Sequence, residues 1–214
     1  MIFWVEHHSS KYPIDLPNPS IKDIKVDIAK LLDIDVASQK LTYNGIHLEN
    51  DKLRAEDYGI KDNDHIFLTA RTDYFFEANG GHHYMRVWED QTVSELKKDV
   101  WVLTGIPAER MELSYIGYKL QDDQTVGSYQ IPEDAIIDVL EWYDMKVMGY
   151  NGIYMLKVHK RMTIGQVKHK LHVEYGLDHT KMRIERAYGK GLFRDNEYLS
   201  SHPHQVIVAL DGGA

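Results

Sequence analysis

The chain has 214 residues, an apolar fraction of 43%, a net charge of −8 and 23 aromatic side chains (14 Tyr, 5 Phe, 4 Trp). This composition is typical of folded proteins and excludes general disorder, and the absence of cysteine excludes disulfides, thiolate metal sites and cysteine nucleophiles. No stretch approaches eighteen uninterrupted apolar residues, and residues 1–6 lack the basic flank of a signal peptide. We therefore expect no membrane partner and a cytoplasmic or nuclear location.

Charge is unevenly distributed along the chain. Residues 1–71 carry 9 basic and 12 acidic side chains, residues 72–144 carry 5 and 15, and residues 145–214 carry 11 and 6. An acidic middle and a basic end do not match the continuous positive surface of a nucleic-acid binder, so we predict no nucleic-acid partner. The three parts either meet differently charged partner surfaces or are simply solvated differently.

The first third of the chain predicts two strands, a helix and further strands. Ile2–Val5 and Tyr12–Leu16 are rich in strand-forming residues and flank a polar bend. A helix capped by Ser20 follows, because apolar residues recur at helical spacing. These residues are Ile21, Ile24, Ile28 and Leu31. Strands are then expected at Lys40–Tyr43 and Ile66–Thr69.

The same order of elements recurs twice, at intervals of 72 and 71 residues. The middle helix begins after Thr92, which has capping-box spacing to Glu95, and the last helix begins after Thr163. The helix pattern of the middle third is Val93, Leu96, Val100 and Leu103. Strands are expected at Tyr74–Phe76, His83–Val87, Glu112–Ile116, Ile136–Leu140, Lys146–Met148, Ile153–Val158, Met182–Arg186 and Val206–Leu210. The chain is thus three repeats of an α+β unit, each a small mixed sheet packed on one main helix.

Segments in all three repeats resemble ubiquitin in order and spacing, and the last third is the most divergent. In the middle third they are Thr92–Lys97, Gly105–Glu109, Gly117–Asp123 and Ser128–Ile131. In the first third they are Leu41–Gly45, Leu48–Asn50 and Asp57–Ile60. In the last third they are Thr163-Ile164, Lys168, Gly176-Leu177 and Ile184. The resemblance implies three tandem β-grasp, or ubiquitin-like, domains at residues 1–72, 73–144 and 145–214. We call these three segments the first, middle and last repeats.

The resemblance also implies a structural role for one helix lysine in each repeat. Ubiquitin-like domains hold this largely buried lysine against a carboxylate, which offsets the desolvation of the ammonium. The lysine position is held by Lys25, Lys97 and Lys168. The resemblance places Asp122 opposite the middle lysine, Asn50 opposite the first and Asp195 opposite the last. We therefore expect the strongest pairing in the middle repeat.

Gly212-Gly213 follow the last expected strand. In ubiquitin-like modifiers an activating enzyme adenylates the terminal glycine carboxylate and passes it to an enzyme cysteine as a thioester, and the acyl group then reaches a lysine amine. By resemblance, Gly213 is the conjugating residue, Gly212 keeps the tail thin, and a processing protease removes Ala214. Asp211 stands directly before Gly212, where the family has basic residues. The tail that leads to the Gly-Gly pair, here called the approach, is also two or three residues shorter than that of ubiquitin. A dedicated activating enzyme is therefore expected.

Neither junction between the repeats contains a Gly-Gly pair. Gly80-Gly81 lies within an expected hairpin, where glycines serve the turn. We therefore predict one fused unit with short, semi-rigid linkers, and not a precursor that is cut into single modifiers.

Ubiquitin's exposed apolar recognition patch is not fully kept in any repeat. The matching positions are Thr42 and Thr69, Ser114 and Leu140, and Glu185 and Ala209. Because such a patch provides the affinity of a weak docking surface, we expect ubiquitin receptors to bind poorly.

The twelve histidines do not predict a metal site. His7-His8 and His82-His83 are adjacent pairs, and adjacent residues of a strand point to opposite faces. His169 and His172 are three residues apart on the last helix and are expected to face solvent. The sequence contains no nucleophile elbow, phosphate loop or paired catalytic carboxylates. We therefore expect no cofactor and no enzymatic activity.

Two hypotheses remain for the function. The first is a triple ubiquitin-like modifier, joined to targets through Gly213 after loss of Ala214. It would require activating and conjugating enzymes, a processing protease and target proteins. The second is a non-conjugated adaptor that binds partner proteins through several surfaces. In either case, Trp142 at a junction is a candidate contact between the middle and last repeats.

Overall fold

The chain is described here from a computed structural model, which defines residues 1–149, 152–185, 191–199 and 207–211. The chain forms two compact units. One contains residues 1–75, 84–96 and 121–136, and the other contains residues 76–83, 97–120 and 137 onwards. The division passes through the middle repeat, so the domain borders expected at 72/73 and 144/145 stay predictions.

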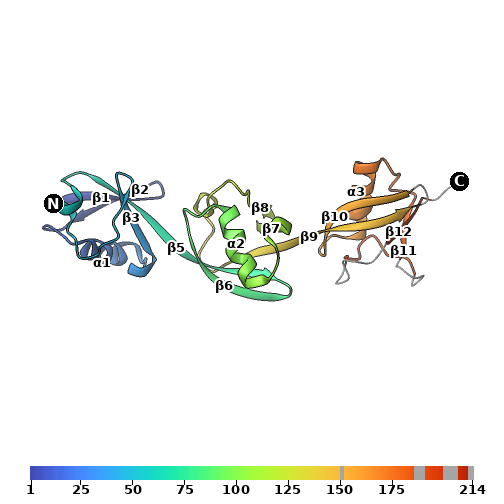
Figure 1. The fold of residues 1–214 in the computed structure, drawn as a ribbon, viewed down its shortest axis with the longest axis horizontal. Coiled ribbons are helices and arrows are strands. Elements are labelled where there is room, and N and C mark those ends of the chain that lie inside the picture. The colour runs from blue at the N-terminus through green and yellow to red at the C-terminus, as the bar shows by residue number, and fades with distance from the viewer. Residues whose placement is uncertain (150–151, 186–190, 200–206, 212–214) are drawn as a thin grey trace. The chain divides into compact units, whose positions relative to one another are not determined.

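The order of elements recurs along the chain (Figure 1). The first part contains β1 (Ile2–His7), β2 (Ser10–Asp15), α1 (Ile21–Leu32), β3 (Gln39–Tyr43), β4 (Ile46–His47) and β5 (His65–Ala78). The second contains β6 (Gly81–Trp88), α2 (Val93–Thr104), β7 (Met111–Tyr115), β8 (Tyr118–Lys119) and β9 (Ala135–Gly149). The third contains β10 (Gly152–His159), α3 (Ile164–Tyr175), β11 (Met182–Glu185) and β12 (Ile207–Asp211). Short 3-10 helices lie at Val36–Ser38, Ala55–Tyr58, Ala108–Arg110 and Val126–Tyr129.

Strand pairing follows one scheme. In the first repeat β1 pairs antiparallel with β2 and parallel with β5, and β3 pairs antiparallel with β4 and β5. In the last repeat β9 pairs antiparallel with β10 and parallel with β12, which is antiparallel to β11. In the middle repeat β7 pairs antiparallel with β8 and β9, and β5 pairs with β6. A mixed sheet with a parallel central pair and one main helix is the β-grasp arrangement, so the predicted α+β fold is confirmed.

One stripe of each helix is buried. In α1, Ile21, Ile24 and Ile28 are fully buried and pack with β1, β2 and β3 in a single core cluster. Leu31, which we expected in the same stripe, is 50% exposed, and its counterpart Leu103 in α2 is 40% exposed. The stripe shifts by one residue at the end of α1, where Leu32 packs on the core, because a true helix advances 3.6 residues a turn.

The helix starts are fixed by reciprocal capping boxes. The Thr92 amide donates to Glu95 Oε2 at 2.9 Å and the Glu95 amide donates to Thr92 Oγ1 at 3.2 Å, as its spacing predicted. The same two bonds join Ser20 with Asp23, and Thr163 with Gln166. The recurrence of this local chemistry explains why the helices begin at equivalent places.

The two junctions are uninterrupted strands, where we expected a separate strand on each side of a linker. β5 spans 14 residues and β9 spans 15, and Figure 1 shows each as one continuous ribbon. The buried side chains of β5 on both sides of the junction lie at even positions, namely Ile66, Leu68, Ala70, Tyr74, Phe76 and Ala78. Those of β9 lie at odd positions, namely Ile137, Val139, Met145 and Val147. Because the period of two keeps its phase across each junction, nothing forces the strand to end.

None of the helices in the described residues combines the length and apolar character needed to cross a membrane.

Candidate functional site

The approach to the Gly-Gly pair is a strand held on both sides. β12 lies parallel to β9 and antiparallel to β11, and its last residue, Asp211, pairs with Met182. Gly212, Gly213 and Ala214 lie outside the described residues. Two residues span at most about 7 Å of extended chain. Gly213 is thus two residues from a paired backbone in the sequence, and the expected shortness of the approach stays a prediction.

The helix lysines of the first and last repeats form ion pairs. Lys168 Nζ lies 2.6 Å from Asp195 Oδ1, as the resemblance suggested. Lys25 Nζ lies 2.8 Å from Asp51 Oδ1, so the expectation of Asn50 as its partner is wrong. The two lysine side chains are only 13% and 12% exposed, so each ammonium requires this acceptor.

A shared backbone bond explains the error at Asn50. In each repeat the second residue of the helix donates its amide to the carbonyl of an aspartate. These bonds are Lys22 to Asp51 at 3.1 Å, Ser94 to Asp122 at 3.1 Å, and Gly165 to Asp195 at 2.9 Å. The three aspartates are thus equivalent, and Asn50 precedes the equivalent position in the first repeat by one residue. Lys97 is buried as expected, with 6% exposure; its pairing with Asp122, and the greater strength of that pair, stay predictions.

Asp51→Ala should therefore destabilise the protein more than Asn50→Ala. The first change removes the acceptor of a largely buried ammonium and should lower the free energy of unfolding by about 1–2 kcal/mol. This is less than for a fully buried pair, because Asp51 is 44% exposed. The second should cost no more than about 0.5 kcal/mol. Urea unfolding followed by tryptophan fluorescence measures both, and equal losses would contradict the assignment of Asp51.

The positions that match ubiquitin's recognition patch are not equally accessible. Thr42 and Thr69 are half-buried, and so is Leu140, whereas Ser114 is only 6% exposed. In the last repeat, the strand register corrects the assignment of Ala209 as the residue that matches Thr69. Ala209 pairs with Ile184, which is equivalent to the pairing of Leu68 with Leu41. A slip of one residue exchanges the two faces of a strand, so Leu210, and not Ala209, holds the register position of Thr69.

In the middle repeat, the patch position Ser114 lies beside a carboxylate that pairs with an arginine from later in the chain. Ser114 pairs with Asp138 of β9 in the sheet. Arg161, in the turn between β10 and α3, places its two terminal nitrogens 2.7 Å from Asp138 Oδ1 and 2.8 Å from Glu77 Oε1. The bond to Asp138 raises the pKa of Arg161. This part of the sheet is therefore already engaged by a residue of the chain itself.

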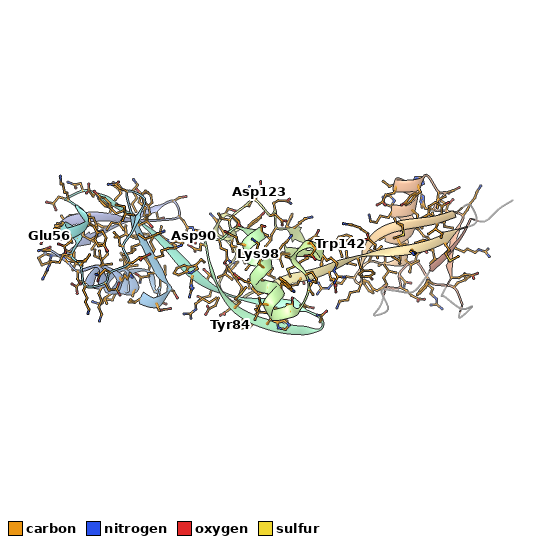
Figure 2. The ribbon with its side chains drawn as sticks, in the orientation of Figure 1. Glu56, Tyr84, Asp90, Lys98, Asp123 and Trp142 are labelled. Atoms are coloured by element: carbon orange, nitrogen blue, oxygen red, sulfur yellow. The ribbon has the colours of Figure 1, made fainter. Side chains whose placement is uncertain are left out.

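The turn between β6 and α2 makes an equivalent contact with the first repeat. Lys40 of β3 pairs with Asp90, and its ammonium lies 5.1 Å from the Trp88 ring centroid. Asp90 is labelled in Figure 2. The Glu89 amide donates to the Ala70 carbonyl at 3.1 Å. In the first two repeats, a strand that carries a patch position is thus contacted by the turn before the next helix.

This turn also brings a carboxylate to the adjacent histidines. His8 Nε2 lies 3.3 Å from Glu89 Oε1, His7 Nδ1 lies 3.9 Å from Glu89 Oε2, and the two imidazole centroids are 4.1 Å apart. Our expectation that the histidines point to opposite faces is wrong, because His8 lies in the turn after β1 with φ of +52°. The partner Glu89 is 81 residues away from His8, and no local spacing indicates the contact.

The fold defines a protein of repeated β-grasp units, and comparison with known proteins identifies their class. The model of the Ubiquitin family matches residues 6–73 and again residues 75–141, and a Ubiquitin-like domain model matches residues 153–196. A solved structure, the ubiquitin-like domain of an Arabidopsis thaliana protein, is 26% identical over 33% of this chain and 77% of its own, with a TM-score of 0.32. The family model covers more than half of the chain. The chain therefore belongs to the ubiquitin family.

Proposed function

We propose that the chain is a fused ubiquitin-like modifier that is joined to target amines through Gly213. The observation that carries the proposal is the position of Gly212-Gly213, directly after the last strand of a ubiquitin-like repeat. In the first two repeats, the equivalent strands β5 and β9 run through the junction without a Gly-Gly pair. The motif is thus placed so that all three repeats would be transferred together.

The chemistry would proceed by acyl transfer at Gly213. A processing protease hydrolyses the bond between Gly213 and Ala214 and leaves a free carboxylate. A carboxylate oxygen then attacks the α-phosphate of ATP, pyrophosphate leaves, and the cysteine thiolate of the activating enzyme displaces AMP to form a thioester. After transfer to a conjugating enzyme, a target amine attacks the thioester and the thiol leaves. The chain supplies the acyl group, and its partners supply all catalytic residues.

Asp211 distinguishes the partners that this modifier would need. Its carboxylate stands immediately before Gly212 and would repel an enzyme surface built for a basic tail. A dedicated activating enzyme, with basic or neutral residues opposite Asp211, would accept it. Such a pathway would operate in the cytoplasm or nucleus.

The proposal is tested by expressing the chain with an N-terminal tag in its native cells. Wild-type protein should form adducts of higher mass that resist reducing agents, and Gly213→Ala should abolish them. Gly81→Ala is the matched control, because a Cβ at Gly81 would meet nothing closer than 3.8 Å. It should leave the adducts unchanged.

Mass spectrometry identifies the linkage directly. A protease that cuts before aspartate would leave the branch Asp211-Gly212-Gly213 on the target lysine. Trypsin would leave a much longer branch, because no lysine or arginine follows Arg194. If the isolated protein keeps Ala214 and no branched peptide forms, the modifier proposal is wrong.

A second candidate, the non-conjugated adaptor, is favoured by exposed apolar side chains at two equivalent turns. Ile46 is 57% exposed at the β3–β4 turn, and Ile116 and Tyr118 are 71% and 77% exposed at the β7–β8 turn. Large apolar residues at turn tips are suited to weak protein binding, and two such tips on one chain can act together. Partners that are retained by Gly213→Ala, but lost when Tyr118 and Ile46 are both changed to lysine, would support the adaptor.

A further inference from the structure

The cluster of His7, His8 and Glu89 has the composition of a metal site. Each residue offers one ligand atom, and these atoms all lie within 4.8 Å of one another. Two imidazoles and one carboxylate are a donor set that zinc takes in proteins, with a fourth position left for water. We propose that His7, His8 and Glu89 bind a zinc ion.

The distances suit zinc after small side-chain movements. Ligand atoms at 2.0–2.2 Å from a tetrahedral zinc are separated by about 3.3 Å. The separation between His8 Nε2 and Glu89 Oε1 is already 3.3 Å, and a ligand nitrogen of His7 lies within 4.8 Å of the ligand atoms of both other residues. We expect rotation of the His7 and Glu89 side chains to supply the remaining adjustment.

The backbone positions all three ligands before an ion arrives. His7 is the last residue of β1 and His8 occupies the left-handed region, so both rings lie on the same side of the turn. Glu89 is held by its amide, which donates to Ala70, and by its carbonyl, which accepts from the Gly127 amide at 2.9 Å. A preorganised site loses less conformational entropy on binding.

Outer contacts orient the ligands. The Ala70 amide donates to Glu89 Oε2 at 3.2 Å, which leaves Oε1 to face His8. His7 Nδ1 lies 3.3 Å from the Leu68 carbonyl, so with its proton on Nδ1 the ring donates to this carbonyl and leaves Nε2 as the ligand atom. Such outer contacts are usual around metal-ligating histidines and carboxylates.

The surrounding charges permit a cation. Arg86 is paired with Asp73 at 2.8 Å, and Lys40 is paired with Asp90, so these two positive charges are compensated. Arg71 lies over the Trp88 ring, 4.3 Å from its centroid. His8 is exposed, and His7 and Glu89 also line a cavity of about 480 Å³. The ligand atoms are therefore accessible from solvent.

Other histidines in the described part of the chain do not form an equivalent group. His169, His172 and His179 have ring centroids 4.9 and 6.4 Å apart, but they do not meet the same ligand-atom distances with a carboxylate or one another. His82 and His83 are a second adjacent pair, on the regular strand β6. This pair provides a matched control for the first.

Bound zinc would join the β1–β2 turn to the turn before α2. His7 and His8 come from the first repeat and Glu89 from the middle repeat, and all three lie in the same compact unit. A ligand that binds only the folded form raises its stability. Zinc should thus raise the melting temperature of the protein.

The test uses the full chain, freed of metal, and titrates it with zinc by calorimetry at neutral pH. Wild-type protein should bind one zinc ion at its tightest site, and His8→Asn and Glu89→Gln should each weaken this site at least roughly tenfold. Asparagine tolerates the positive φ at position 8, and glutamine keeps an oxygen that accepts from Ala70. His83→Asn should bind as wild type does. The zinc-dependent rise in melting temperature should follow the same pattern.

Two results would overturn the proposal. One is no zinc binding by the wild-type chain, in which case the cluster is a hydrogen-bonded ion pair only. The other is a tightest site that survives both substitutions, which would place the ion on other histidines. Circular dichroism of the metal-free variants verifies their folding. If either variant is unfolded, histidine-ring NMR of wild-type protein replaces it: His7 and His8 must be the first rings to shift with zinc.

Discussion

Replacing Phe76 with alanine is expected to lower the free energy of unfolding by about 3–5 kcal/mol, the usual range for a buried phenylalanine. Phe76 lies in the second half of β5 and is fully buried. The loss combines the transfer free energy of the ring with the cost of the cavity that it leaves, because a packed interior relaxes only partly. Chemical unfolding followed by circular dichroism measures the change.

Phe67→Ala is the matched control, since Phe67 lies on the same strand but is 50% exposed. We expect a loss of less than about 0.5 kcal/mol. Equal effects at positions 67 and 76 would mean that burial does not alternate along β5 in solution. The position of Phe76 in the core would then be wrong.

Trp142→Ala is expected to cost about 2–3 kcal/mol, less than for a fully buried tryptophan because this residue is half-buried. Trp142 lies on β9 (Figure 2) and packs against the core of the last repeat. Its ring meets His159 edge-on, with centroids 4.6 Å apart. Trp101→Ala is the control, since Trp101 is 52% exposed and its loss should cost less than about 0.5 kcal/mol.

Trp142→Ala should also change the titration of His159. Burial lowers the pKa of His159 from its ordinary value of 6.5. The nearby charge of Glu112 raises this pKa, and that of Arg161 lowers it, so the pKa stays below 6.5. The unfolded chain then binds this proton more readily than the folded chain. The stability that depends on neutral His159 is therefore lost as pH falls below 6.5. Trp142→Ala hydrates the ring, so its pKa should rise towards 6.5, as measured by NMR.

The two measurements decide what Trp142 does. A stability loss together with a raised pKa of His159 would show that the indole shields this part of the last repeat's core. An unchanged stability and an unchanged pKa would show that the side chain contributes nothing there. The earlier suggestion that Trp142 joins two repeats requires, in addition, that the variant melts less cooperatively than wild type.

The helices could be predicted from sequence because their signals are local. Thr92 and Glu95 meet within one turn, and Ile21, Ile24 and Ile28 follow one face of a helix. Both features depend on spacing alone. The recurrence of these signals three times predicted three repeats of an α+β unit, and the resemblance to ubiquitin then implied the β-grasp fold.

The features that sequence did not predict depend on contacts between distant residues or on a shift of one position. Asp51 and Asn50 are neighbours, and only the contacts of Lys22 and Lys25 show which of them faces the helix. His8 leaves the strand alternation because a tight turn places it at positive φ. Glu89 reaches the histidines through its backbone bonds to Ala70 and Gly127. No pattern within a short window contains these facts.

The uninterrupted strands restrict how the length of this chain can change during evolution. Between Ala70 and Tyr74, the removal or insertion of one residue would exchange the buried and exposed positions of everything that follows in β5. A change of two residues would preserve them. The same parity holds between Val139 and Met145 in β9. Tandem copies joined in this way can thus lengthen or shorten their junctions only in pairs of residues, whereas a loop would tolerate any number.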